Sequence, residues 1–324
     1  MAQRNTTERR SFRVVAFSLS WFTSFAFVAG CSSSGEQRKR NPASETPMNN
    51  TTTGQVQCAG RFFFEAPEAM NVTGRSQSMY GTNVTTIPVP SGGIDAYWAG
   101  RLAQMGAAQR EFELQAGVKG AWSARNPVFP KLLTMEIVQP VSGGLIVVDR
   151  QADTGKESVA EKLVKAIIDS YVPTNDHGFC IGIGAITLGP SQNEQVRLTL
   201  GDSSAPEVEI RLETRTVREP DTKTYSDVDE EKSLASASGG TLDVLRDQKR
   251  SGAGLPGKEI WISLVVPGDK PGMRFTWHYP GIGASGTQPS INIVGTAPVE
   301  KKSQLEAIWE SVLTSLRAVP LAAR

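Results

Sequence analysis

Histidine and cysteine are scarce in this chain. Of 324 residues only 2 are His and 3 are Cys, and no Cys-x-x-Cys or His-x-x-x-His pair occurs among them. Imidazole and thiolate groups hold zinc in most structural and catalytic sites. The composition argues against a histidine-rich metal centre, and we expect neither a metal site nor a cofactor.

A net charge of one sign is also missing. The 34 Lys and Arg balance the 33 Asp and Glu, so the formal net charge is +1. Non-specific binding to nucleic acid requires clustered basic residues that neutralise phosphates. We therefore expect no nucleic-acid partner.

The sequence lacks a recognisable catalytic motif. Gly283-Ala284-Ser285-Gly286 has the wrong spacing for a hydrolase nucleophile turn. Gly182-Ile183-Gly184 lacks the third glycine and the helix of a dinucleotide-binding loop. Asp229-Glu230-Glu231 lies in a polar stretch, where a charge run is usually solvated, and neither Cys58 nor Cys180 has the surroundings expected of a nucleophile. We expect no enzyme activity and no small-molecule substrate.

The apolar run near the N-terminus is too short and too polar for a membrane span. It extends from Val14 to Ala29 with Ser and Thr inside it, whereas a spanning helix needs roughly 20 apolar residues. Four arginines precede it, which is typical of a secretion signal. Val28-Ala29-Gly30-Cys31 follows and resembles a bacterial lipobox. Residues 1–30 are predicted to be a lipoprotein signal peptide and Cys31 the lipid attachment site; the alternative is an ordinary secretory signal with a fortuitous cysteine.

Residues 31–56 are predicted to be a flexible tether, because Ser, Asn, Thr and Pro dominate them and they cannot bury enough apolar surface to order. The residue after Cys31 is Ser32, whereas an Asp at this position would resemble a signal for retention in the inner membrane. We therefore expect a periplasmic protein held by its lipid on the outer membrane.

Two cysteines remain once Cys31 is lipidated. An even number in an oxidising compartment favours a Cys58–Cys180 disulfide. Two buried free thiols are the alternative, because the sequence does not show whether the two Cα atoms approach.

The predicted fold is α+β, with two similar domains at residues 57–173 and 174–324, each a mainly antiparallel sheet with packed helices. Each half opens on a Cys-x-Gly segment, at Cys58 and Cys180, and closes with an amphipathic helix before a proline. Strands are expected at residues 62–64, 145–148, 206–217, 260–266, 273–277 and 290–294, closing helices at 159–171 and 305–316, and further helices at 95–115 and 240–250.

Several segments carry a family resemblance. They are Cys58-Ala59-Gly60-Arg61-Phe62 with Pro67, His177-Gly178-Phe179-Cys180, Gly257-Lys258-Glu259, Phe275-Thr276-Trp277-His278-Tyr279-Pro280-Gly281, Pro289-Ser290-Ile291-Asn292-Ile293 and the run Ile308–Arg317. In this order they resemble the lipoprotein immunity proteins that neutralise type VI secretion lipase effectors, specifically the fourth class of Tle-cognate immunity protein. Val319 departs from the arginine usual in that family shortly after the position of Arg317.

The resemblance implies inhibition by binding. Such proteins are thought to grip a phospholipase effector between two domains and to hold its lid closed, in a toxin–antitoxin-like pair. The partners implied are therefore a cognate type VI lipase effector and, through the lipid anchor, a membrane. A periplasmic lipoprotein that binds an envelope component without a toxin partner is the alternative.

Two polar stretches, residues 218–240 and 279–288, are candidate binding loops, because exposed loops on a rigid scaffold often carry binding sites. From these stretches we predict five effector-binding residues: Arg218, Asp229, Tyr279, Gly281 and Gln288.

Overall fold

The structure, a computed structural model, describes residues 54–106, 109–124, 129, 131–222 and 228–320. All of them belong to one compact unit, Thr51–Arg324. The predicted signal peptide, Cys31 and the tether up to residue 53 lie outside the described residues. No helix among the described residues is long and apolar enough to span a membrane.

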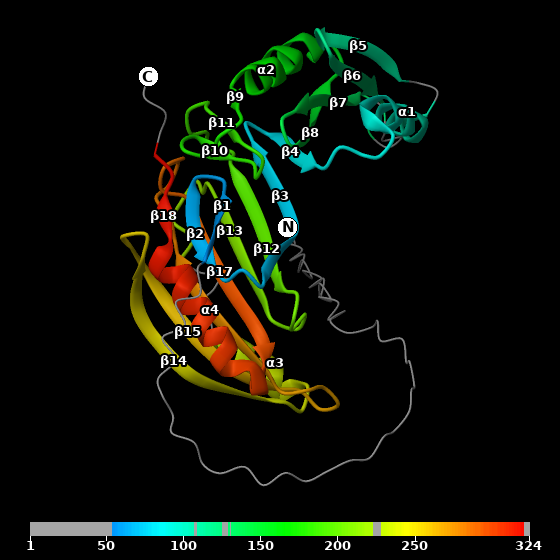
Figure 1. The fold of residues 1–324 in the computed structure, drawn as a ribbon. Coiled ribbons are helices and arrows are strands. Elements are labelled where there is room, and N and C mark those ends of the chain that lie inside the picture. The colour runs from blue at the N-terminus through cyan, green and yellow to red at the C-terminus, as the bar shows by residue number, and fades with distance from the viewer. Residues whose placement is uncertain (1–53, 107–108, 125–128, 130, 223–227, 321–324) are drawn as a thin grey trace, which may run out of the picture. The chain divides into compact units, whose positions relative to one another are not determined.

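A 12-stranded antiparallel sheet organises the described residues (Figure 1). One part of it, here called the β12–β17 lobe, contains in spatial order β14 (Thr241–Gly252), β15 (Leu255–Val265), β16 (Gly272–Tyr279), β17 (Ser290–Pro298), β13 (Glu209–Arg215), β12 (Gln195–Asp202) and β3 (Met70–Met79). Buried and more exposed residues alternate along β12 and β13, as expected for strands with one face on a core.

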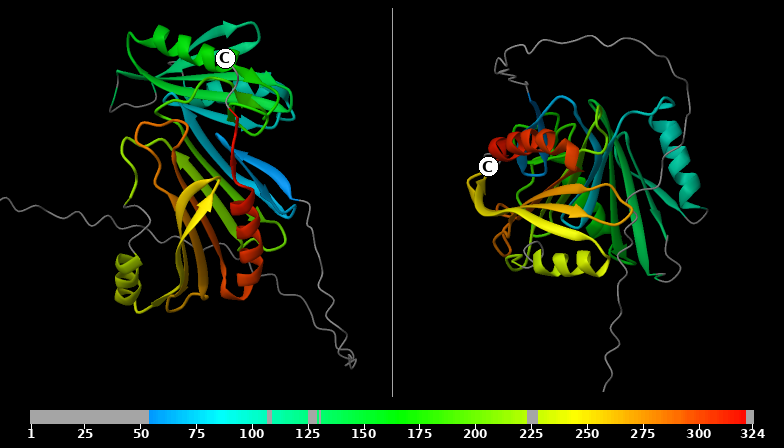
Figure 2. Two further views of the ribbon diagram at one scale, coloured as in Figure 1. Left: turned by 90° about the vertical axis from the view of Figure 1, so that its left-hand side faces the viewer. Right: turned by 90° about the horizontal axis from the view of Figure 1, so that it is seen from below.

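Two helices lie on opposite faces of the β12–β17 lobe (Figure 2). Helix α4 (Lys302–Ser315), entered through a 3-10 turn at Val299–Lys301, buries Trp309 against Phe275 of β16. Helix α3 (Val228–Ala237) packs on β14. The hairpin of β1 (Gln55–Ala59) and β2 (Phe62–Ala66) covers the α4 face further along, and β18 (Arg317–Ala318) pairs with β2.

The rest of the sheet, here called the β4–β8 lobe, contains β4 (Thr82–Ile87), β8 (Gly144–Asp153), β7 (Leu132–Val141), β6 (Val118–Ser123) and β5 (Arg110–Gln115). Helix α2 (Glu157–Asp169) buries Val164 and Ile167 in the main core. Helix α1 (Gly93–Met105) packs Trp98 against Val138 and Val147 in a second cluster. Both faces are thus covered, which explains why β7 and β8 are almost continuously apolar at their centres.

A small sheet follows the β4–β8 lobe along the chain. It consists of β9 (Tyr171–Val172), β10 (Phe179–Cys180) and β11 (Ala185–Ile186). The main core continues from one lobe into the other, because Val84 and Ile146 belong to the same buried cluster as Ile181 and Val196.

The structure confirms the α+β class and most of the predicted strands and closing helices. Two helix predictions are wrong. Residues 241–252 form strand β14, because the Ala253-Gly254 turn, with both residues at positive φ, folds them back to pair with β15. Residues 110–115 form strand β5, so the predicted helix at 95–115 ends at Met105.

The predicted domain boundaries stay a prediction, and so does the similarity of the two halves. Strand pairing crosses the boundary at residues 173/174: β3 pairs with β12, and β2 pairs with β18. Residues 55–79 therefore pack with the C-terminal part of the chain.

Candidate interaction surface

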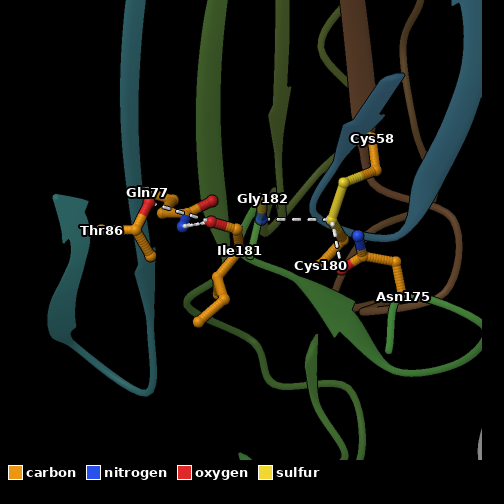
Figure 3. Close-up of a disulfide and its surroundings, with 7 residues drawn as sticks. All are labelled: Cys58, Gln77, Thr86, Asn175, Cys180, Ile181 and Gly182. Carbon is orange, nitrogen blue, oxygen red and sulfur yellow. Dashed lines mark hydrogen bonds between the residues drawn. A yellow bond between two sulfur atoms is a disulfide. The ribbon is translucent and has the colours of Figure 1, made fainter. Parts of the chain in front are cut away.

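The predicted disulfide is present and lies where the two lobes meet. Cys58 of β1 is bonded to Cys180 of β10, with the two Cα atoms 6.1 Å apart, inside the usual range (Figure 3). The backbone N–H of Cys180 donates to Gly60 O at 2.7 Å. The bond thus ties the β1–β2 hairpin to the segment Cys180–Gly184.

That segment contacts both lobes. Ile181 O accepts hydrogen bonds from Thr86 Oγ1 of β4 at 3.2 Å and from Gln77 Nε2 of β3 at 3.4 Å (Figure 3). At Gly184 a Cβ atom would lie 2.4 Å from Val172 O, and the residue has a positive φ. Only glycine fits there without displacing the neighbouring strand.

A buried ion pair joins the β1–β2 turn to the residue before β12. Arg61, in the β1–β2 turn, donates from Nε and Nη2 to the two carboxylate oxygens of Glu194 at 2.8 and 2.7 Å. The two side chains are only 6% and 7% exposed. Arg61 also donates to Leu188 O, and Glu194 accepts from the Ser191 N–H. Both carboxylate oxygens of Glu194 thus accept hydrogen bonds, two at Oε1 and one at Oε2, as a buried charge requires.

A second buried carboxylate, Glu259 of β15, joins the sheet to α4. It is fully buried and accepts hydrogen bonds from Trp309 Nε1, Gln248 Nε2 and Arg250 Nη1 at 2.7, 2.6 and 2.7 Å. Burial alone raises the pKa of Glu259, but these hydrogen bonds and the positive charge of Arg250 outweigh it and hold the pKa below the usual range. The sequence singled out Glu259 only through the family resemblance.

Glu259→Gln is expected to lower the free energy of unfolding at neutral pH by about 1–3 kcal/mol, because a neutral amide then replaces the carboxylate that accepts charge-assisted hydrogen bonds. Since the folded pKa of Glu259 is depressed, its contribution is complete above the unfolded pKa of about 4.5 and is lost as pH falls through the folded pKa. Urea unfolding at pH 7 and at pH 3 measures this. A stability difference between variant and wild type that does not shrink at pH 3 contradicts the assignment.

Four of the five predicted effector-binding residues lie together. Tyr279, buried at the end of β16, donates from its hydroxyl to Gln288 Oε1 at 3.4 Å. Gly281 has φ +80°, and a Cβ there would lie 2.5 Å from Ser290 N. Arg218 lies next to this loop, because the N–H of Ala284 donates to the O of the preceding residue, Val217, at 2.7 Å. The side chain of Arg218 is exposed.

Asp229 lies elsewhere, exposed in the first turn of α3. That helix contacts the start of β16 through Glu231 and Arg274, whereas Tyr279 ends the same strand. Tyr279 and Gly281 shape the loop, and Arg218 and Asp229 have exposed side chains. Contact of any of the five with an effector stays a prediction.

Arg218 also borders a surface hollow of about 510 Å³ that residues 215–222 line. Arg215 pairs with Asp221 at 2.5 Å in its wall. Within the described ranges no group of three or more His, Cys, Asp or Glu is placed to hold a metal ion.

The family model of the Tle cognate immunity protein 4 C-terminal domain matches residues 172–320. Residues 172–320 therefore belong to the Tle cognate immunity protein family. The matched region runs from β9 to β18, and so includes the disulfide cysteine Cys180, Glu194 and Glu259.

Solved structures resemble this chain over most of their length. A structure described as "The crystal structure of Tle4-Tli4 complex" matches with a TM-score of 0.69 and 18% identity, covering 85% of this chain and all of the other. The apo immunity protein TplEi of Pseudomonas aeruginosa matches with a TM-score of 0.67 and 17% identity, covering 84% and 99%. At such identities the likeness establishes the shared fold. A comparison with curated proteins gave no significant match.

Proposed function

We propose that this immunity protein binds a cognate type VI phospholipase effector in the periplasm and inhibits it. The family match carries the proposal, since it covers the whole region from β9 to β18. The fold supports it, because the likeness extends over the full length of a chain in the Tle4–Tli4 complex structure. In this proposal the two lobes grip the effector and prevent its lid from opening, so the chain acts by binding and performs no catalysis.

The first experiment combines binding with inhibition. The soluble part of the protein, starting after Cys31, is mixed with the phospholipase encoded by the neighbouring gene, and complex formation and vesicle hydrolysis are measured in the same sample. We expect a stoichiometric complex and loss of hydrolysis. No complex with undiminished hydrolysis refutes the proposal and favours the envelope-binding lipoprotein.

A second substrate tests how inhibition works. If the lid is held closed, the complex no longer hydrolyses phospholipid vesicles. It still hydrolyses a small soluble ester slowly, at the rate that the free enzyme shows in the absence of vesicles. Equal loss of both activities indicates instead that the inhibitor covers the active site itself.

We further propose that Cys31 anchors the protein to the outer membrane. Diacyl and acyl chains together exceed what a single chain provides for lasting attachment, and tethering raises the local concentration of the inhibitor at the membrane that the lipase attacks. Cys31→Ala is expected to move the protein from the membrane fraction to the soluble periplasm. An unchanged membrane fraction for Cys31→Ala argues against lipidation.

A further inference from the structure

Strand β3 has one free edge. On one side it pairs with β12 from Met70 to Ser78, but on the other it pairs with β4 only at Ser78 and Met79. In Figure 1 β3 is the last strand of the β12–β17 lobe, and β4 diverges from it after the turn. Within the described chain, no backbone hydrogen bond reaches residues 71–77 from that side. The long sheet is therefore open between β3 and β4.

The backbone of Arg75 is directed at this opening. Tyr80 and Gly81, at φ 51° and 69°, form the two-residue turn between β3 and β4. The two residues that flank such a turn, here Met79 and Thr82, direct their backbone N–H and C=O groups at each other. Along a strand these backbone groups point alternately to one side and to the other, so every second residue points the same way. The N–H and C=O groups of Gln77 and Arg75 therefore also face away from β12.

The side chain of Arg75 has no partner for its charge. Its Nη1 is buried without a hydrogen bond, and no ion pair of this residue is present in the described parts of the chain. The guanidinium packs against Gly182, where a Cβ would lie 3.4 Å from Cζ. The residue opposite Arg75 on the neighbouring strand β12 is the apolar Leu198. Burial lowers its pKa to about 10, so it remains a cation at neutral pH. A carboxylate in contact with this group would stabilise it.

The free edge of β3 also lacks the usual protection. Edge strands commonly carry several charges or proline, which prevent pairing with other chains. Strand β14, at the end of the sheet, has Arg246, Asp247, Lys249 and Arg250. Residues 71–77 contain no proline, and Arg75 is their only charged residue. The β3 edge is thus suited to accept a strand.

We propose that residues 71–77 of β3 bind an extended segment of the phospholipase effector as an added strand, with an Asp or Glu of that segment on Arg75. This inference rests on the proposed function and assigns a contact within it. Backbone hydrogen bonds along the edge would supply affinity, and the charged pair would select the acidic segment. The Cys180–Gly184 segment holds the guanidinium in place through Gly182.

The test uses the soluble protein and the phospholipase encoded by the neighbouring gene. Arg75→Glu is expected to raise the Kd by about 30-fold or more, since it places like charges together, and Arg75→Ala less. Arg197→Ala is the matched control, because Arg197 lies on the neighbouring strand β12 in a half-exposed pair with Glu213 and is expected to leave the Kd unchanged. Thermal unfolding separates binding from folding: losing an unpaired guanidinium should not lower the Tm.

Amide hydrogen exchange provides the second readout. In the complex, exchange in the peptide that covers residues 70–78 should slow at least 10-fold. Tight binding with unchanged exchange there, or a wild-type Kd for Arg75→Glu, overturns the inference and leaves the proposed function intact. Absence of any complex with the wild type instead refutes the proposed function. If the protein dimerises in a concentration-dependent way and Arg75→Glu abolishes the dimer, a second copy of this chain binds the β3 edge. That result also overturns the inference.

Discussion

Replacing Cys58 and Cys180 together by Ser is expected to lower the free energy of unfolding by about 2–5 kcal/mol. The bond joins residues separated by 122 positions, and closing a loop of that size removes much of the entropy of the unfolded chain. Both cysteines are buried, so the serine hydroxyls also replace a well-packed bond. Denaturant unfolding of the oxidised proteins measures the difference.

Reduction is the control for the disulfide. A reducing agent should destabilise the wild type by a similar amount and leave the Cys58→Ser/Cys180→Ser variant unchanged. Because the bond anchors the Cys180–Gly184 segment, whose Ile181 O contacts both β3 and β4, we also expect weaker effector binding by the variant below its unfolding transition. A variant as stable as the wild type contradicts this assignment.

Arg61→Ala is expected to lower the free energy of unfolding by about 3–5 kcal/mol. The substitution leaves Glu194 buried, at 7% exposure, with its charge uncompensated. Glu194→Ala should have a cost of the same order, since among the described residues the Arg61 guanidinium then retains only Leu188 O as a hydrogen-bond partner. Urea unfolding of both single variants measures these losses.

The double variant tests whether the two side chains act as a pair. Arg61→Ala/Glu194→Ala should be clearly more stable than the sum of the single losses predicts, because the second substitution removes a charge that no longer has a partner. Strict additivity shows that the two residues act separately. Lys156→Ala, which breaks an exposed pair with Asp153, should change stability by less than about 1 kcal/mol.

Local patterns identified most of the strands correctly. Alternating Ile210 and Leu212 predicted β13, and the apolar repeat through Ile308 and Trp309 predicted α4, because each pattern follows from one element burying one face. The pattern failed at residues 240–250, where Leu242 and Leu245 fit a helical spacing. These residues form a strand because they pair with β15, which is eleven residues long. A bulge between Val244 and Arg246 leaves Leu245 without a partner residue on β15.

The candidate site was less accessible from the sequence. Tyr279, Gly281 and Gln288 were predicted together, and the structure places them at the end of β16 and in the loop that follows it, beside Arg218. Nothing in the local sequence indicates that Arg75 lacks a partner or that Arg61 meets Glu194, because 133 positions separate the latter two residues. Contacts of this kind depend on how distant strands are ordered in the sheet.

By itself the sequence determined the α+β class, the two pairing cysteines and the family resemblance, since composition, short-range periodicity and linear motifs carry this information. Only the tertiary structure showed that residues 55–79 pack with the C-terminal part of the chain, that Glu259 and Glu194 are buried carboxylates held by several donors, and that β3 keeps a free edge. These features arise from strand order and register, which are set by the burial of side chains from many distant segments at once.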